Sequence, residues 1–305
     1  MTEQYTFAVA RIRAKELSLF DRQDIEQLLA CKSYQDCLNL LFDKGWGTGE
    51  EKTAEQILSI ELQRTWELMR ELIVDISVFD VFVYPIDFNN LKAAIKAVIT
   101  NSATDGLFLN GGTVSPTHMI EAVRKKDFSE LPEFMKNAAS EAYETLLHTG
   151  DGQLCDIILD RAALEAILSA GKDSDNELIQ QYAELTVAVA DIKIAVRGNK
   201  TGKSASFLKK AMAPCNTLNV DLLISATGKG MDDIFAYLAG TAYAAAVEEL
   251  KKSPSAFEKW CDDIVIELIR GQKSNPFTIG PLAAYFLARQ NEMKTVRILL
   301  SGKLN

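Results

Sequence analysis

Apolar residues recur three or four positions apart along most of the chain, which is the spacing that places them on one face of an α-helix. Residues 5–20 show this spacing, and a longer amphipathic segment follows at 53–74. Asp21 and Ser33 stand immediately before periodic segments, where helix-capping side chains are expected. The pattern predicts an all-α fold.

Residues 76–84 are the one stretch that resembles a strand, because they are apolar and rich in β-branched side chains. Their neighbours on both sides follow a helical pattern, so we expect a helix here too. Pro85 is then expected to begin the next helix, since proline suits a first turn. Ser115-Pro116 likewise marks a helix start. Further helices are predicted at about 134–148, 153–170, 175–197, 240–252 and 255–271, and in a final segment ending near residue 300.

One helical motif returns at a nearly constant step. It begins at Asn90, Asp191 and Asn291, so that successive copies are 101 and 100 residues apart. A degenerate fourth copy, Tyr5 to Arg11, opens the chain. A step of this size indicates an internal repeat. Each of the three full copies has a β-branched residue five places on (Ile95, Val196, Val296) and a cation six places on (Lys96, Arg197, Arg297).

The repeat predicts three pseudo-symmetric helical units, at about 5–90, 91–191 and 192–305, that close into a funnel-shaped ring. Chance alignment of Ala- and Leu-rich helices is the alternative. The cations Lys96, Arg197 and Arg297 have two interpretations. They could be charges at helix C-termini that the helix dipole favours. They could instead converge on a threefold axis and meet a partner.

Composition limits the function classes. Of 305 residues, 48% are hydrophobic and 25% charged, which is ordinary for a folded protein, and the net charge of −9 gives no support for nucleic-acid binding. The five cysteines form no CxxC pair, so we expect reduced thiols and no zinc site. The first residues do not resemble a signal peptide. No apolar run is long enough for a membrane span, so any membrane role is expected to be peripheral.

Candidate catalytic motifs are weak. Gly198–Ser204 resembles a phosphate-binding loop, but it is one residue short and follows a predicted helix, so a loop between helices is favoured. His118 and His148 have no nearby nucleophile or pair of metal ligands in sequence and are expected on the surface. Asp156 and Asp160 share a helix face, but the Glu-x-x-His partner of a di-metal site is absent, so a solvated face or an answering Arg161 is expected. We therefore expect no catalytic residue, cofactor or metal.

Four segments are specific enough to suggest a relationship, namely Ala10–Ala14, Asp87–Lys92, Pro281–Glu292 and Val296–Lys303. They resemble the C subunit of the V-type or archaeal-type ATP synthase, a family to which the d subunit of the eukaryotic V-type ATPase also belongs. The sequence has only Tyr5 where the family opens on a Tyr-Gly-Tyr-like stretch, and it stops soon after Gly302-Lys303. The extreme termini therefore carry the least of the resemblance.

The resemblance implies a funnel-shaped, all-helical, non-catalytic subunit of a rotary ATPase. Such a subunit lies on the cytoplasmic side of the membrane ring of proteolipids and holds the foot of the central shaft, which couples ATP chemistry to proton or sodium transport. The residues expected to bind a partner are the cations of the repeat copies, namely Arg11, Lys96, Arg197 and Arg297. The alternatives are an unrelated helical-repeat scaffold and an enzyme that uses Gly198–Ser204 as a nucleotide loop.

Overall fold

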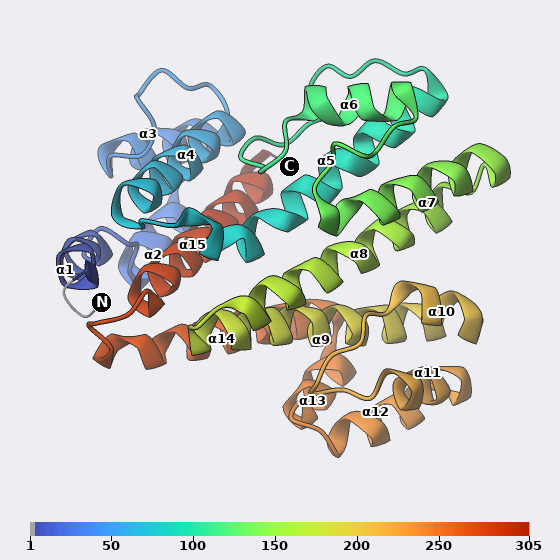
Figure 1. Ribbon diagram of the computed structural model, residues 1–305. Coiled ribbons are helices and arrows are strands. Elements are labelled where there is room, and N and C mark those ends of the chain that lie inside the picture. Colours follow the sequence, from blue (N-terminus) through green and yellow to red (C-terminus); the bar gives the residue numbers. More distant parts are fainter. Residues whose placement is uncertain (1–3, 305) are drawn as a thin grey trace. The chain divides into compact units, whose positions relative to one another are not determined.

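The fold is known from a computed structural model that describes residues 4–304. Within this range all regular elements are helices and none is a strand, so the all-α prediction is confirmed (Figure 1). The chain forms two compact units. Unit 1 combines the N-terminal part up to Ile76 with the C-terminal part from Asp262, and unit 2 is Ser77–Cys261. Helix α14, Pro254–Arg270, begins in unit 2 and ends in unit 1.

Unit 1 is built around the C-terminal helix α15, which packs against α1, α3 and α4. Its core contains Leu38, Leu41 and Ile57 from the N-terminal part together with Val296 and Leu300 from α15, all essentially buried. The elements of unit 1 other than α14 are α1 (Gln4–Glu16), α2 (Arg22–Ala30), α3 (Tyr34–Asp43), α4 (Ala54–Leu72), the 3₁₀ turn η2 (Gly271–Ser274) and α15 (Gly280–Leu304).

Three helices of unit 1 begin with a capping box. In α2 the Asp21 side chain accepts from the backbone of Asp24, whose carboxylate accepts from the Asp21 N–H in return. Ser33 begins α3 and Thr53 begins α4 in the same reciprocal way. Such caps satisfy backbone donors that a helix start leaves without partners. The predicted caps Asp21 and Ser33 are therefore confirmed.

Unit 2 is built around α5, α8 and α9. Helix α5 packs against α6, α7 and α8, and α8 packs in turn against α9. Phe88, Leu91 and Ile95 of α5 are buried in the resulting core. The elements are η1 (Ile76–Phe79), α5 (Asp80–Thr100), α6 (Pro116–Lys125), α7 (Glu133–Thr149), α8 (Gly152–Asp173), α9 (Glu177–Lys200), α10 (Ala205–Ala211), α11 (Val220–Lys229), α12 (Met231–Ala239) and α13 (Ala244–Lys252).

The ambiguous segment 76–84 is helical, as predicted, because a 3₁₀ turn at Ile76–Phe79 leads directly into α5. Pro85 does not begin a helix, however. It lies inside α5, five residues after Asp80, where it has no N–H to donate to the carbonyl of Val81. The apolar residues of α5 on both sides of Pro85 are buried, and this burial outweighs the missing hydrogen bond.

A second correction concerns Gly198. The sequence predicts a loop throughout Gly198–Ser204, but α9 continues to Lys200. Gly198 is buried where α9 meets α10, and a Cβ atom there would stand 2.6 Å from Cδ2 of Leu208. This glycine therefore permits close helix packing and does not end the helix.

Gly171 allows the close approach of α8 to α9, because a Cβ atom at this position would overlap Cβ of Ala183. We expect Gly171→Ala to lower the free energy of unfolding by about 1–2 kcal/mol, since overpacking outweighs the better helix propensity of alanine. Gly228→Ala in α11 is the matched control, because no described atom outside the adjacent backbone of its own helix lies within 4 Å of the added Cβ. Urea unfolding of both variants measures the difference, and equal effects would refute the packing role of Gly171.

Candidate partner-binding site

The four predicted partner-binding cations lie on four helices. Arg11 is on α1 and Arg297 on α15, both in unit 1, whereas Lys96 is on α5 and Arg197 on α9, both in unit 2. Three of them are engaged in ion pairs within their own unit, and the fourth has no such pair among the described residues. This difference decides which cation is available to a partner.

Lys96 joins α5 to α8. Its Nζ donates to Oδ2 of Asp156 at 2.8 Å, and both side chains are about two-fifths exposed. One turn earlier, Lys92 donates to Asp160 at 2.6 Å. Asp156 and Asp160 therefore form ion pairs with two lysines of α5. The expected partner Arg161 pairs with Glu165 instead.

Arg297 and Arg11 make the corresponding contacts in unit 1. The guanidinium of Arg297 binds both carboxylate oxygens of Glu55 on α4, at 2.9 and 3.1 Å. Arg11 forms an ion pair with Glu71, also on α4, and this hydrogen bond raises the pKa of Arg11 and lowers that of Glu71. These cations fasten helices of unit 1 together.

The interpretation of the cations as helix C-terminal charges holds for Arg197 alone. Arg197 lies in the last turn of α9, where the helix dipole favours a positive charge. Lys96 is four residues from the end of α5 and Arg297 seven residues from the end of α15, so neither lies in the last turn. For those two the ion pairs with a neighbouring helix are the better explanation.

Exposed ion pairs of this kind contribute little, so we expect Lys96→Ala and Arg297→Ala each to lower the free energy of unfolding by only about 0–1 kcal/mol. The loss should shrink further at high salt, because exposed charges are screened. Thermal unfolding at low and high ionic strength measures both effects. A loss of unfolding free energy several times larger would mean that these ion pairs are needed for the packing of α5 or α15.

Arg197 is exposed and makes no ion pair with any described residue. It borders a groove of about 190 Å³ between α9 and the segments that follow. Lys200, one turn farther on, is also exposed and unpaired among the described residues. The groove is lined by Lys193, Val196, Arg197, Lys200, Met231, Leu250, Pro254, Phe257 and Glu258.

Sequence reasoning missed a set of buried polar side chains on the same helices. Asn90, Asp191 and Glu292 are almost fully buried and lie 101 residues apart. Each accepts a hydrogen bond from the backbone N–H of a loop residue, so each fixes a loop against its long helix. The donors are Leu109 N at 2.8 Å for Asn90, Ala213 N at 3.1 Å for Asp191 and Phe20 N at 2.5 Å for Glu292.

The lysines two residues after these positions behave alike. Lys92, Lys193 and Lys294 are again 101 residues apart, and each donates to a carboxylate of a neighbouring helix. These contacts favour Glu292, and not Asn291, as the counterpart of Asn90 and Asp191. A constant step of 101 could have revealed this set in the sequence. The acceptors are Asp160 at 2.6 Å, Glu258 at 2.7 Å and Asp262 at 2.6 Å.

Glu292 also belongs to a buried charge network in unit 1. Arg289 forms ion pairs with both Glu61 and Glu292, and all three side chains are less than a tenth exposed. The Arg289 guanidinium also lies over the ring of Trp46, 4.3 Å from its centroid. Burial raises the pKa of Glu292, while Arg289 acts in the opposite direction. The network connects the loop before α2, the loop before α4 and helix α15.

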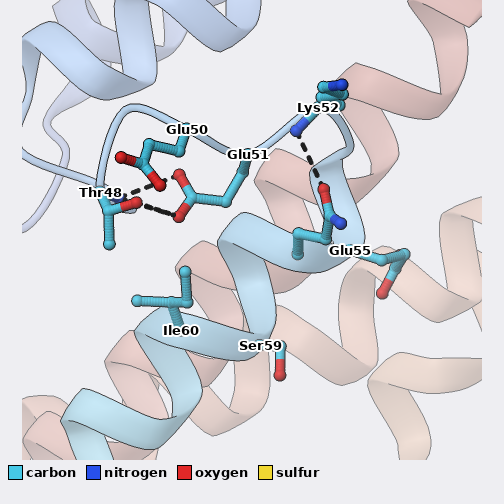
Figure 2. Close-up of a pocket in the computed structure, with 8 residues that line it drawn as sticks. Thr48, Glu50, Glu51, Lys52, Glu55, Ser59 and Ile60 are labelled. Carbon is cyan, nitrogen blue, oxygen red and sulfur yellow. Dashed lines mark hydrogen bonds between the residues drawn. The ribbon is translucent and has the colours of Figure 1, made fainter.

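A surface pocket of unit 1, of about 740 Å³, lies at the start of α4 and is acidic (Figure 2). Glu51 accepts from the hydroxyl of Thr48 at 2.5 Å and from its N–H at 2.9 Å, and these hydrogen bonds lower the pKa of Glu51 to about 2. Lys52 N donates to Gln56. These contacts order the loop before α4, and the Glu51 carboxylate is bound within this loop.

The remaining sequence candidates have structural explanations. The N–H groups of Thr201, Gly202 and Lys203 donate to carbonyls of the α9 end, so they do not form a phosphate cradle. That the segment binds no nucleotide stays a prediction. His148 is exposed beside Glu144, and His118 is partly exposed on α6. In residues 4–304 no three His, Cys, Asp or Glu side chains are grouped to hold a metal, and no two of the cysteines form a disulfide.

Comparison with known proteins places the chain in a class. The family model of the ATP synthase (C/AC39) subunit matches residues 8–305, so the chain belongs to this family. The resemblance noted in the sequence is thereby confirmed. Among the described residues, no helix has both the length and the apolar character needed to cross a bilayer.

Individual relatives agree with this assignment. The chain is 25% identical to the A-type ATP synthase C subunit of Methanocaldococcus jannaschii, over 98% of this chain and 83% of that protein. It is 23% identical to the V-type sodium ATPase C subunit of Enterococcus hirae, over 96% of this chain and 92% of that protein. A similar match, 26% identical over 97% and 85%, is the A-type ATP synthase C subunit of a Desulfurococcus species. The chain is thus a subunit of the rotary ATPase type.

Proposed function

We propose that this chain is a non-catalytic central-stalk subunit of a V-type or archaeal-type ATPase. It acts as a socket that couples the rotating central shaft to the membrane ring of proteolipids, for proton or sodium transport. The observation that carries the proposal is the match of the ATP synthase (C/AC39) subunit family over residues 8–305, with relatives named as C subunits aligned along nearly the whole chain. Its place would be the cytoplasmic face, peripheral to the membrane.

The proposal includes a funnel of three helical repeats, at about 5–90, 91–191 and 192–305. The equivalent contacts at a step of 101 residues support it. Asn90, Asp191 and Glu292 each hold a loop, and Lys92, Lys193 and Lys294 each reach a neighbouring helix. In a ring of similar units, equivalent residues lie in equivalent positions, which is why their contacts should match.

Among the four proposed partner-binding cations, Arg197 is the strongest candidate. Arg11, Lys96 and Arg297 would have to give up the carboxylates of Glu71, Asp156 and Glu55 before they could bind a partner. Arg197 has no such competitor among the described residues. A charge that is already solvated and unpaired binds an incoming carboxylate without first breaking an internal ion pair.

Co-expression with the shaft subunits of the same ATPase tests this function. The chain should co-elute with the shaft in size-exclusion chromatography and should also be retained by the detergent-solubilised proteolipid ring. A chain that binds neither, while those subunits assemble with one another, would refute the proposal. It would favour a helical-repeat scaffold unrelated to rotary ATPases.

A further inference from the structure

The groove beside Arg197 is a docking site for an acidic, amphipathic helix of a partner protein, we propose. Its apolar part is formed by Val196, Met231, Leu250, Pro254 and Phe257, and the cations Lys193, Arg197 and Lys200 lie along α9. The identity of the partner protein rests on the proposed function, because that function gives the chain two protein partners, the shaft and the ring.

The local charge points to an acidic occupant. The groove holds three cations and one carboxylate, Glu258, and this carboxylate is taken by Lys193 at 2.7 Å. Among the described residues, Arg197 and Lys200 therefore have no carboxylate partner, on a chain whose net charge is −9. Such a local reversal of charge attracts a partner of the opposite sign and fixes its orientation.

Comparison of equivalent positions shows how the site arises. Glu55, Asp156 and Phe257 are 101 residues apart, and each lies near the start of a long helix. Glu55 binds Arg297 and Asp156 binds Lys96. At the third position the acid is replaced by Phe257, so that Arg197 lacks its internal partner and the groove gains an apolar floor. A carboxylate of the partner would pair with Arg197 in the way that Glu55 pairs with Arg297 and Asp156 pairs with Lys96.

Size and spacing favour a helix over a small molecule. The volume of about 190 Å³ is below the roughly 300–1,000 Å³ of typical small-molecule sites, but it accommodates an inserted apolar side chain. Arg197 and Lys200 are three residues apart on one helix, so they lie on the same face. Two carboxylates three or four residues apart on a partner helix have the matching spacing, with leucine-type side chains beside them entering the groove.

A peptide assay tests the site independently of the ATPase. The probe is a fluorescent stapled helix that carries two glutamates four residues apart beside leucines, titrated against the full chain by anisotropy. We expect saturable binding that weakens at least about tenfold with Arg197→Glu/Lys200→Glu, and similarly when the glutamates of the peptide become glutamines. The control Lys209→Glu/Lys210→Glu changes the same charge on exposed residues of α10 and should leave binding unchanged. No saturable binding, or equal loss in both variants, would overturn the proposal.

Photo-crosslinking in the assembled ATPase identifies the natural segment. With benzoylphenylalanine at position 231, we expect a crosslink to a helix that carries carboxylates three or four residues apart, and none from position 222, an exposed site on α11. If the complex assembles but position 231 crosslinks nothing, the groove proposal fails while the coupling function stands. If the peptide binds but no ATPase subunit associates with the chain, the coupling function fails while the groove stands.

Discussion

Replacing Arg289 by methionine should lower the free energy of unfolding by about 3–5 kcal/mol, because it leaves two carboxylates buried without their shared cation. Glu61 retains its ion pair with Arg64, whereas Glu292 retains the N–H of Phe20 but loses its cation. The loss should be smaller at acidic pH. Burial already raises the pKa of Glu292, and removing Arg289 raises it further, so that protonation relieves the repulsion as the pH falls.

Two further variants make this experiment specific. Arg270→Met removes an exposed arginine that pairs with Glu267, and it should cost no more than about 1 kcal/mol. The triple change Arg289→Met/Glu61→Gln/Glu292→Gln removes the buried charges together and should be less damaging than Arg289→Met alone. Urea unfolding measures all three. If Arg289→Met costs no more than Arg270→Met, the buried network does not hold unit 1 together.

Asp191→Asn should raise the free energy of unfolding by about 2–4 kcal/mol at pH 8. The Asp191 side chain is fully buried, and its Oδ2 has no hydrogen-bond partner among the described residues. Burial raises its pKa to about 7, whereas an aspartate in an unfolded chain titrates near 4. Asparagine preserves the acceptor for Ala213 N without a buried charge, as Asn90 does for Leu109 N.

The sign of the pH dependence follows from proton binding. Between about pH 4 and 7 the folded protein retains a proton at Asp191 that the unfolded chain has lost, so the parent loses stability as the pH rises through this interval and changes little above it. The Asp191→Asn variant lacks this slope.

Asn90→Asp is the reciprocal control. It removes the donor to the Leu109 carbonyl and should destabilise the protein at neutral pH. Urea unfolding from pH 4 to 8.5 compares the variants. A difference between the parent and Asp191→Asn that stays constant over this range would contradict a buried, titrating carboxyl.

The helical fold is predictable because apolar spacing and capping residues act locally. Asp21 and Ser33 start the helices that the sequence predicts, and the helical neighbours of residues 76–84 correctly outweigh their β-branched composition. The predictions for Pro85 and Gly198 are wrong for a common reason. In the sequence both residues indicate a helix end. In the structure, packing against neighbouring helices keeps α5 continuous across the proline and α9 continuous across the glycine.

The charged contacts are only partly predictable, because their partners are far apart in sequence. Arg289 meets Glu61 across 228 residues, and no local pattern indicates this pairing. The repeat could have narrowed the choice of partners, since Glu55 and Asp156, the partners of Arg297 and Lys96, lie one step of 101 residues apart. When the third motif is placed at Asn291, the buried polar position at Glu292 is missed. Its role becomes clear only from its hydrogen bond with the N–H of Phe20.

Ion pumping in membranes with and without this chain tests the proposed coupling function most directly. Inverted vesicles that contain the ATPase but lack the chain should still hydrolyse ATP, because the chain is proposed to be non-catalytic, yet they should build no proton or sodium gradient. Adding back the purified chain should restore pumping and make hydrolysis sensitive to the gradient. Pumping that is unchanged without the chain, or hydrolysis that disappears from the catalytic sector when only this chain is removed, would contradict the proposed function.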